Sequence, residues 1–190
     1  MADEITSISA SRLSQAIKSR DVSCIEVMLA YLERIYRYNP LYNAIVSQVD
    51  DSELLRQAEA ADKALLKGEY WGWMHGMPHA IKDLADAQGL VSTYGSPIFA
   101  QNVATADSLP VARIRAQGAI FIGKTNTPEM GAGGNTFNDI FGMTRNPWNT
   151  QRNAGGSSGG SAVALATGLG PVAVLTLVGA IFQVPLNSVT

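Results

Sequence analysis

The sequence is poor in the residues that bind metals and form disulfides. Its 190 residues include one cysteine, Cys24, and two histidines, His75 and His79. A single cysteine cannot form a disulfide within the chain, and this favours a reducing, cytoplasmic location. The histidines have the i, i+4 spacing of a helical metal site, but Gly76 and Pro78 between them argue against a helix. We therefore expect no metal ion and no cofactor.

Charge is also scarce and nearly balanced. Charged residues make up 16% of the chain, with 14 lysines and arginines against 16 aspartates and glutamates. Such a chain offers no general basic surface, so nucleic acid is not expected as a partner. The N-terminal residues are acidic and polar and lack the apolar segment of a signal peptide. A hydrophobic fraction of 46% excludes general disorder.

The first part of the chain, residues about 6–70, has the apolar spacing of helices. Ser23 and Glu26 have the spacing of a capping box, and Pro40 is predicted to end the helix that begins there. A short strand is predicted near residues 43–49, followed by a third helix. We expect these elements to serve packing alone. The expected buried face of the capped helix consists of Ile25, Met28, Leu29, Leu32 and Ile35.

The second part, residues about 71–172, is rich in loops and contains short apolar runs. Residues 119–123, AIFIG, read as a buried strand, and the preceding VARIRAQG is typical of a helix that ends at a glycine. A helix followed directly by a buried strand indicates an α/β fold.

Lys82 lies in the run HAIKDL and admits two interpretations. In the first, Lys82 lies at the surface, as most lysines do, and forms an ion pair with the adjacent Asp83. The alternative is a lysine on a buried strand, where desolvation lowers the pKa of the amine and makes it a neutral base. Taken alone, the run favours the surface lysine.

The run GGSSGGS at residues 155–161 has the composition of a flexible linker. However, a helix of small residues follows at once, and no charged residue occurs from Ser161 to Thr190. An order of glycine loop, small helix, turn and apolar strand, VAVLTLV, is typical of a buried segment. We therefore expect the glycines to permit a close approach of the backbone.

Four segments together resemble the amidase signature family. They are GMPHAIKDL, GKTNTPEMG, FGMTRNPWN and GGSSGGSAVALATG, in this order. The resemblance runs from about residue 6 to Pro171. It implies an α/β fold with a mixed central sheet covered by helices, of which this chain is an incomplete N-terminal portion. One truncated amidase domain would span residues 1–190, with helices to about residue 70, the start of the α/β core at about 71–172 and a divergent tail at 173–190.

The resemblance also implies a chemistry. Members of this family hydrolyse the C–N bond of small-molecule amides with a Ser–cis-Ser–Lys triad. Lys82 matches the lysine of that triad, and Ser157 matches the serine that has a cis peptide bond. The neutral lysine accepts a proton through this serine from a second serine, which attacks the amide carbonyl. Ser158 is a candidate for a supporting hydrogen bond.

The tail departs from the family pattern. With Pro171 in register, Gly179 and Pro185 still fit, but the attacking serine is replaced by Ile181, which has no nucleophilic atom. The other positions that differ are Leu177 for an aspartate, Ala180 for a glycine and Gln183 for an arginine. The chain is thus expected to be an inactive amidase. The alternative is an amidase-like protein, a pseudoenzyme, that binds or regulates. The tail itself is either natural or the product of a frameshift or gene-model error.

Residues 168–186 admit one further interpretation. They are uncharged and nearly long enough to span a bilayer, for which about 20 apolar residues are needed. Gly170, Pro171, Gln183 and Pro185 interrupt this run, and it has no basic flank. We favour a buried strand with a divergent tail, and we do not expect a membrane as a partner.

Overall fold

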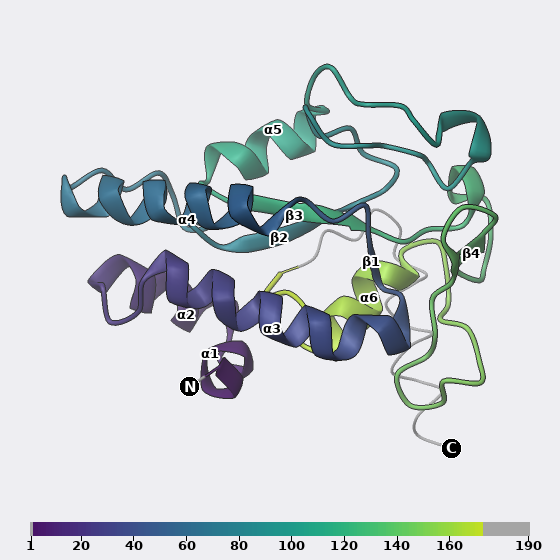
Figure 1. The fold of residues 1–190 in the computed structure, drawn as a ribbon, viewed down its shortest axis with the longest axis horizontal. Coiled ribbons are helices and arrows are strands. Elements are labelled where there is room, and N and C mark those ends of the chain that lie inside the picture. Colours follow the sequence, from purple (N-terminus) through teal and green to yellow (C-terminus); the bar gives the residue numbers. More distant parts are fainter. Residues whose placement is uncertain (1, 173–190) are drawn as a thin grey trace.

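Helices at the N-terminus cover one side of a small mixed sheet (Figure 1). The computed structural model describes residues 2–172. The helices before the sheet are α1 (Ala2–Ser7), α2 (Ala10–Ser19), α3 (Cys24–Tyr42) and α4 (Asp51–Leu66). The later helices are α5 (Leu109–Ala116) and α6 (Gly159–Ala166), with 3-10 turns at Pro97–Phe99 and Glu129–Gly131.

The α3 helix begins as the sequence predicts. The Ser23 hydroxyl accepts a hydrogen bond from the Glu26 amide at 3.1 Å, and the Glu26 carboxylate accepts one from the Ser23 amide at 2.8 Å. This reciprocal arrangement is the predicted capping box, because each side chain satisfies a backbone donor of the first turn.

Two expectations about α3 are wrong. The helix does not end at Pro40 but continues to Tyr42, because backbone bonding resumes beyond the proline with the Asn43 amide donating to the Asn39 carbonyl at 2.7 Å. Leu29 is 49% exposed and does not belong to the buried face. The apolar stripe is centred elsewhere on the helix, on Cys24, Val27, Met28, Tyr31, Leu32 and Ile35.

The sheet has the strand order β1-β3-β2. Strands β2 (Pro78–Lys82) and β3 (Ile120–Thr125) are parallel, and β1 (Ile45–Val46) pairs with β3 in antiparallel orientation. All residues of the three strands are buried, which is typical of parallel strands covered on both faces. A separate hairpin pairs β4 (Phe137–Asn138) with β5 (Gly142–Met143).

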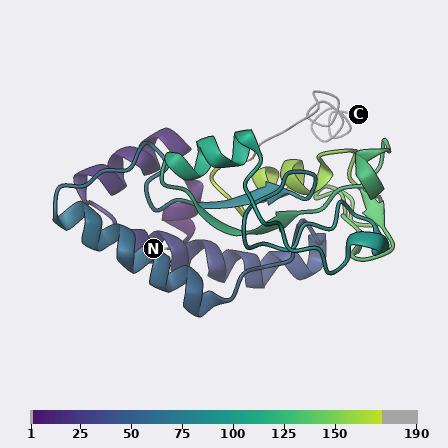
Figure 2. The same cartoon turned by 90° about the horizontal axis from the view of Figure 1, so that it is seen from above.

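Helices cover both faces of the β2–β3 pair. In Figure 1, α5 lies on one side of the two strands, and α3 and α6 lie on the other. Figure 2 shows α3 and α4 packed along each other on the N-terminal side. The main hydrophobic core lies between these layers and includes Leu13, Ile17, Met28, Ile35, Leu54, Met77 and Ile122.

Within residues 2–172, no helix combines the length and apolar character needed to cross a membrane. Most of the uncharged run at 168–186 lies outside the described residues, as does all of the predicted strand VAVLTLV except its first residue, Val172.

Asn39 connects the end of α3 to β1. Its side-chain oxygen accepts hydrogen bonds from the Ala44 and Ile45 amides at 2.9 and 2.8 Å, and its amide nitrogen donates to the Ile45 carbonyl at 2.8 Å. These bonds fix the turn that places β1 beside β3.

Replacing Asn39 with alanine should lower the free energy of unfolding by about 2 kcal/mol, because backbone groups of the turn lose their partners. Urea denaturation followed by circular dichroism measures this change. Glu33→Ala is the control, since Glu33 lies on the exposed side of the same helix. Equal stability of the two variants would contradict the assignment.

Candidate active site

Lys82 ends β2 with its side chain buried inside the molecule. It is 1% exposed, and its ammonium donates hydrogen bonds to the hydroxyls of Ser157 and Ser158, both at 2.8 Å. Among the described residues, no carboxylate lies within ion-pairing distance of its nitrogen. Burial lowers the pKa of Lys82 to about 8, because desolvation disfavours the charged form.

The interpretation of Lys82 as a surface lysine paired with Asp83 is wrong. Asp83 is the first residue after β2 and lies in a turn, where its side chain contacts other residues than Lys82. Its carboxylate accepts hydrogen bonds from the amide and the hydroxyl of Thr93 and lies 3.9 Å from the Lys124 ammonium. The lysine that pairs with Asp83 is therefore Lys124 of β3.

The structure brings the three site residues predicted from the sequence together. The peptide bond between Gly156 and Ser157 is cis. The Thr127 hydroxyl donates a hydrogen bond to the Ser157 carbonyl at 3.0 Å and so fixes the Ser157 backbone. Ser158 immediately precedes α6 and is fully buried. Both serine hydroxyls thus face the Lys82 amine from one loop.

Two further polar residues on the same face of the strands were missed at the sequence level. Thr125 lies opposite Lys82 in the parallel register, and its hydroxyl is 2.6 Å from that of Ser161 on α6. Both belong to segments that resemble the family, GKTNTPEMG and GGSSGGS, but only the strand pairing reveals that they adjoin Lys82. They tie α6 to β3 beside the lysine.

The glycines of GGSSGGS allow α6 to approach the sheet closely. A Cβ atom on Gly160 would lie 2.3 Å from the Asn126 amide nitrogen, and one on Gly159 would lie 2.1 Å from the Thr136 hydroxyl. Real Cβ atoms do not approach other atoms so closely. The run is therefore a packed segment of the site, as the sequence predicts, and not a linker.

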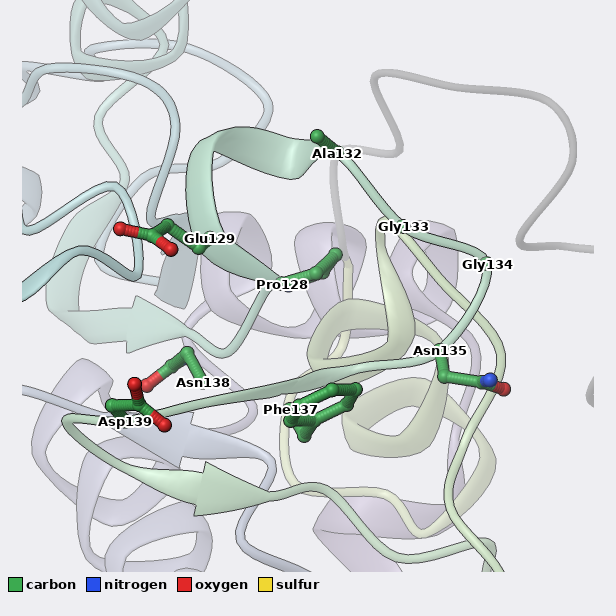
Figure 3. A pocket seen from close by; sticks show the side chains of 9 residues that line it. All are labelled: Pro128, Glu129, Ala132, Gly133, Gly134, Asn135, Phe137, Asn138 and Asp139. Atoms are coloured by element: carbon green, nitrogen blue, oxygen red, sulfur yellow. The ribbon is translucent and has the colours of Figure 1, made fainter.

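A pocket of about 290 Å3 lies beside this loop (Figure 3). In Figure 3, Glu129 and Asp139 lie toward one side of it, and Asn138 lies close to Asp139. The Asn138 amide donates to the Thr127 carbonyl at 2.8 Å, and the Gly156 amide donates to the Gly134 carbonyl at 2.8 Å. The pocket wall thus contacts the segment that carries Ser157.

The two histidines lie outside the site and outside any helix. The His75 ring lies tilted against that of Trp71, with ring centroids 4.5 Å apart, and its Nε2 is 3.0 Å from the Ala61 carbonyl oxygen. His79 lies within β2, where burial lowers its pKa to about 4. Residues 2–172 contain no group of three or more histidine, cysteine, aspartate or glutamate side chains placed to hold a metal ion.

The expected nucleophile position, Ile181, lies outside the described residues, as do Leu177, Gly179, Ala180, Gln183 and Pro185. Of the expected catalytic residues, the structure therefore describes Lys82, Ser157 and Ser158.

The sequence model of the amidase family, described as Amidase, matches residues 26–180. An acylamidase from Rhodococcus erythropolis is 42% identical over 166 residues, which is 87% of this chain and 35% of the acylamidase. An indoleacetamide hydrolase from Bradyrhizobium diazoefficiens is 40% identical, over 83% of this chain and 30% of that hydrolase. The chain thus spans about a third of the length of these curated relatives.

Solved structures show the same architecture. A bacterial aryl acylamidase of the Amidase signature enzymes superposes with a TM-score of 0.81 and 35% sequence identity. The match covers 87% of this chain and 34% of that enzyme. The predicted α/β fold is confirmed, and the described residues correspond to an N-terminal part of it.

Gly160→Ala should lower the free energy of unfolding by about 3 kcal/mol or more, because the new methyl group must displace backbone atoms. Gly134→Ala is the matched control, since a Cβ there meets nothing within 4 Å. Thermal melts of both variants measure the difference. A melting temperature of Gly160→Ala as high as that of Gly134→Ala would contradict the packing described here.

Lys82 should impose a pH dependence on stability. Its folded-state pKa of about 8 lies below the ordinary lysine pKa of 10.5, so the unfolded chain binds more protons between these values. The stability of the wild type relative to Lys82→Met should therefore rise from pH 8 to 10.5 and be constant below about pH 7. Urea unfolding across this range measures it. Lys63→Met, which replaces an exposed lysine, is the control for removing a lysine.

Proposed function

The chain belongs to the amidase signature family, and from this premise we propose that residues 2–172 provide the proton-accepting part of an amide hydrolase. The observation that carries the proposal is the buried amine of Lys82, hydrogen-bonded to two serines and without an acidic partner among the described residues. A lysine in that environment loses its proton at a pH near neutrality, unlike a lysine paired with a carboxylate.

The proposed reaction moves one proton in each direction. In a complete enzyme, the attacking serine passes its proton to the Ser157 oxygen, and Ser157 passes its own proton to the neutral Lys82 amine. The serine oxygen bonds to the amide carbonyl carbon, the C–N bond breaks, and the leaving amine takes a proton back from Lys82 through Ser157. Water then releases the acyl group as a carboxylic acid. The role of Ser158 is to accept a second hydrogen bond from Lys82 and orient the amine.

The proposed substrate is a small-molecule amide. Three relatives support this class by their names: an acylamidase, an indoleacetamide hydrolase and an aryl acylamidase. The chain alone is proposed to be inactive, because Ile181 stands where the attacking serine is expected. That substitution also favours the second candidate function, an amidase-like protein that binds an amide and does not cleave it.

Completing the fold should restore hydrolysis. We expect a chimera of residues 1–171 with the remaining C-terminal sequence of the Rhodococcus acylamidase to release p-nitroaniline from an acyl p-nitroanilide. Lys82→Met and Ser157→Ala in the chimera should lower kcat by about 100-fold or more, the scale of general acid–base catalysis. Absorbance at constant pH measures the rate, and Lys63→Met serves as the lysine control. A chimera whose rate is the same with Lys82→Met would refute the assignment.

The unaltered chain separates the two candidate functions. If the unaltered chain releases p-nitroaniline no faster than its Lys82→Met variant does, the result agrees with both candidate functions. Saturable binding of the anilide by the unaltered chain, measured by calorimetry, favours the binding protein, whereas the absence of binding favours an inactive amidase.

A further inference from the structure

A second buried lysine, Lys124, lies beside the candidate site, and the proposed reaction does not use it. Lys124 is fully buried on β3. It pairs in register with Ile81, the residue before Lys82, whereas Thr125 pairs with Lys82. Because side chains alternate along strands, Lys82 and Thr125 face α6, and Lys124 lies on the other face.

The charges around Lys124 form a set separate from the site. Its ammonium lies 3.9 Å from the Asp83 carboxylate and donates a hydrogen bond to the Ala85 carbonyl at 2.6 Å. The carboxylates of Asp86 and Asp107 also act on it through charge. Asp107 is itself paired with Arg115 at 2.6 Å. Among the described residues, the Lys82 amine, by contrast, forms hydrogen bonds only with the two serine hydroxyls.

The negative charge of the Asp83 carboxylate affects the site because Asp83 directly follows Lys82 in the sequence. It is fully buried, and burial raises its pKa, an effect opposed by the Thr93 hydrogen bonds and by the charge of Lys124. An uncompensated anion here would favour the charged form of Lys82, which is the form that cannot accept a proton.

We propose that Lys124 is a positioning residue of the candidate site: it holds Asp83 on the far face of the strands and cancels its charge, so that Lys82 stays without an acidic partner. This inference rests on the proposed function of Lys82 as a base. The Thr93 amide and hydroxyl complete the arrangement, because they fix the direction of the Asp83 side chain.

The proposal predicts shifts of opposite sign in the pKa of Lys82. Lys124→Gln retains a donor for the Ala85 carbonyl but removes the cation, so the Lys82 pKa should rise by roughly half a unit to one unit. Asp83→Asn leaves the Lys124 cation uncompensated, so the Lys82 pKa should fall. The double variant should return it close to the wild-type value.

The measurement is a pH titration of the full chain with 13C- and 15N-labelled lysine, followed by NMR. The Lys82 signal is identified as the one missing from Lys82→Met. If Lys124→Gln does not fold, Thr93→Val provides the same test, because it frees one side of the Asp83 carboxylate and should also raise the Lys82 pKa. Lys63→Met is the control and should leave the Lys82 titration unchanged.

An ion pair that only stabilises the fold would give a different result. Both single variants would then lose stability and leave the Lys82 titration in place, and that result would overturn the proposal. The readout needs no turnover, so it is independent of the chimera experiment. If the chimera does not hydrolyse the anilide but the predicted pKa shifts of Lys82 are observed, the result would count against the proposed function alone.

Discussion

The rest of the described structure depends on one constraint, the burial of the Lys82 amine. A charged ammonium loses favourable hydration when it is buried, so it needs hydrogen-bond acceptors or a partner of opposite charge. Here two serine hydroxyls 2.8 Å away supply the acceptors. Neutral hydroxyls stabilise the cation less than a carboxylate would, and this leaves the pKa of Lys82 at about 8. Near pH 8, the Lys82 amine therefore exists in both its charged and its neutral form.

This constraint explains the composition of the loop that carries the serines. Both hydroxyls reach one nitrogen only if the start of α6 packs directly on the end of β3. Gly160 permits this approach because any side chain would collide with the Asn126 backbone. The Thr125–Ser161 contact then fastens the helix beside the lysine. A sequence that looks like a linker is therefore among the most tightly packed parts of the chain.

Much of the local structure could be predicted from the sequence, and the exceptions have physical causes. The capping box at Ser23 and the strand at residues 119–123 follow from local patterns, so both were predicted. The end of α3 was misplaced because a proline removes one hydrogen bond without preventing the next. The burial of Lys82 did not follow from the run HAIKDL, and only the family resemblance pointed to it. The pairing of Asp83 with Lys124 could not be predicted, because it depends on the register between strands about 40 residues apart in the sequence.

The groups that hold the Lys82 amine all come from one stretch of the described chain. The hydrogen-bond partners of Lys82 and the contacts that hold them come from residues 82–161. The departure from the family pattern that the sequence analysis expects lies after Pro171, outside this stretch. The strand register and the glycine contacts that place the amine are made by residues before Pro171. In the proposed reaction, the proton acceptor and the expected nucleophile position, Ile181, thus lie in separate segments of the sequence.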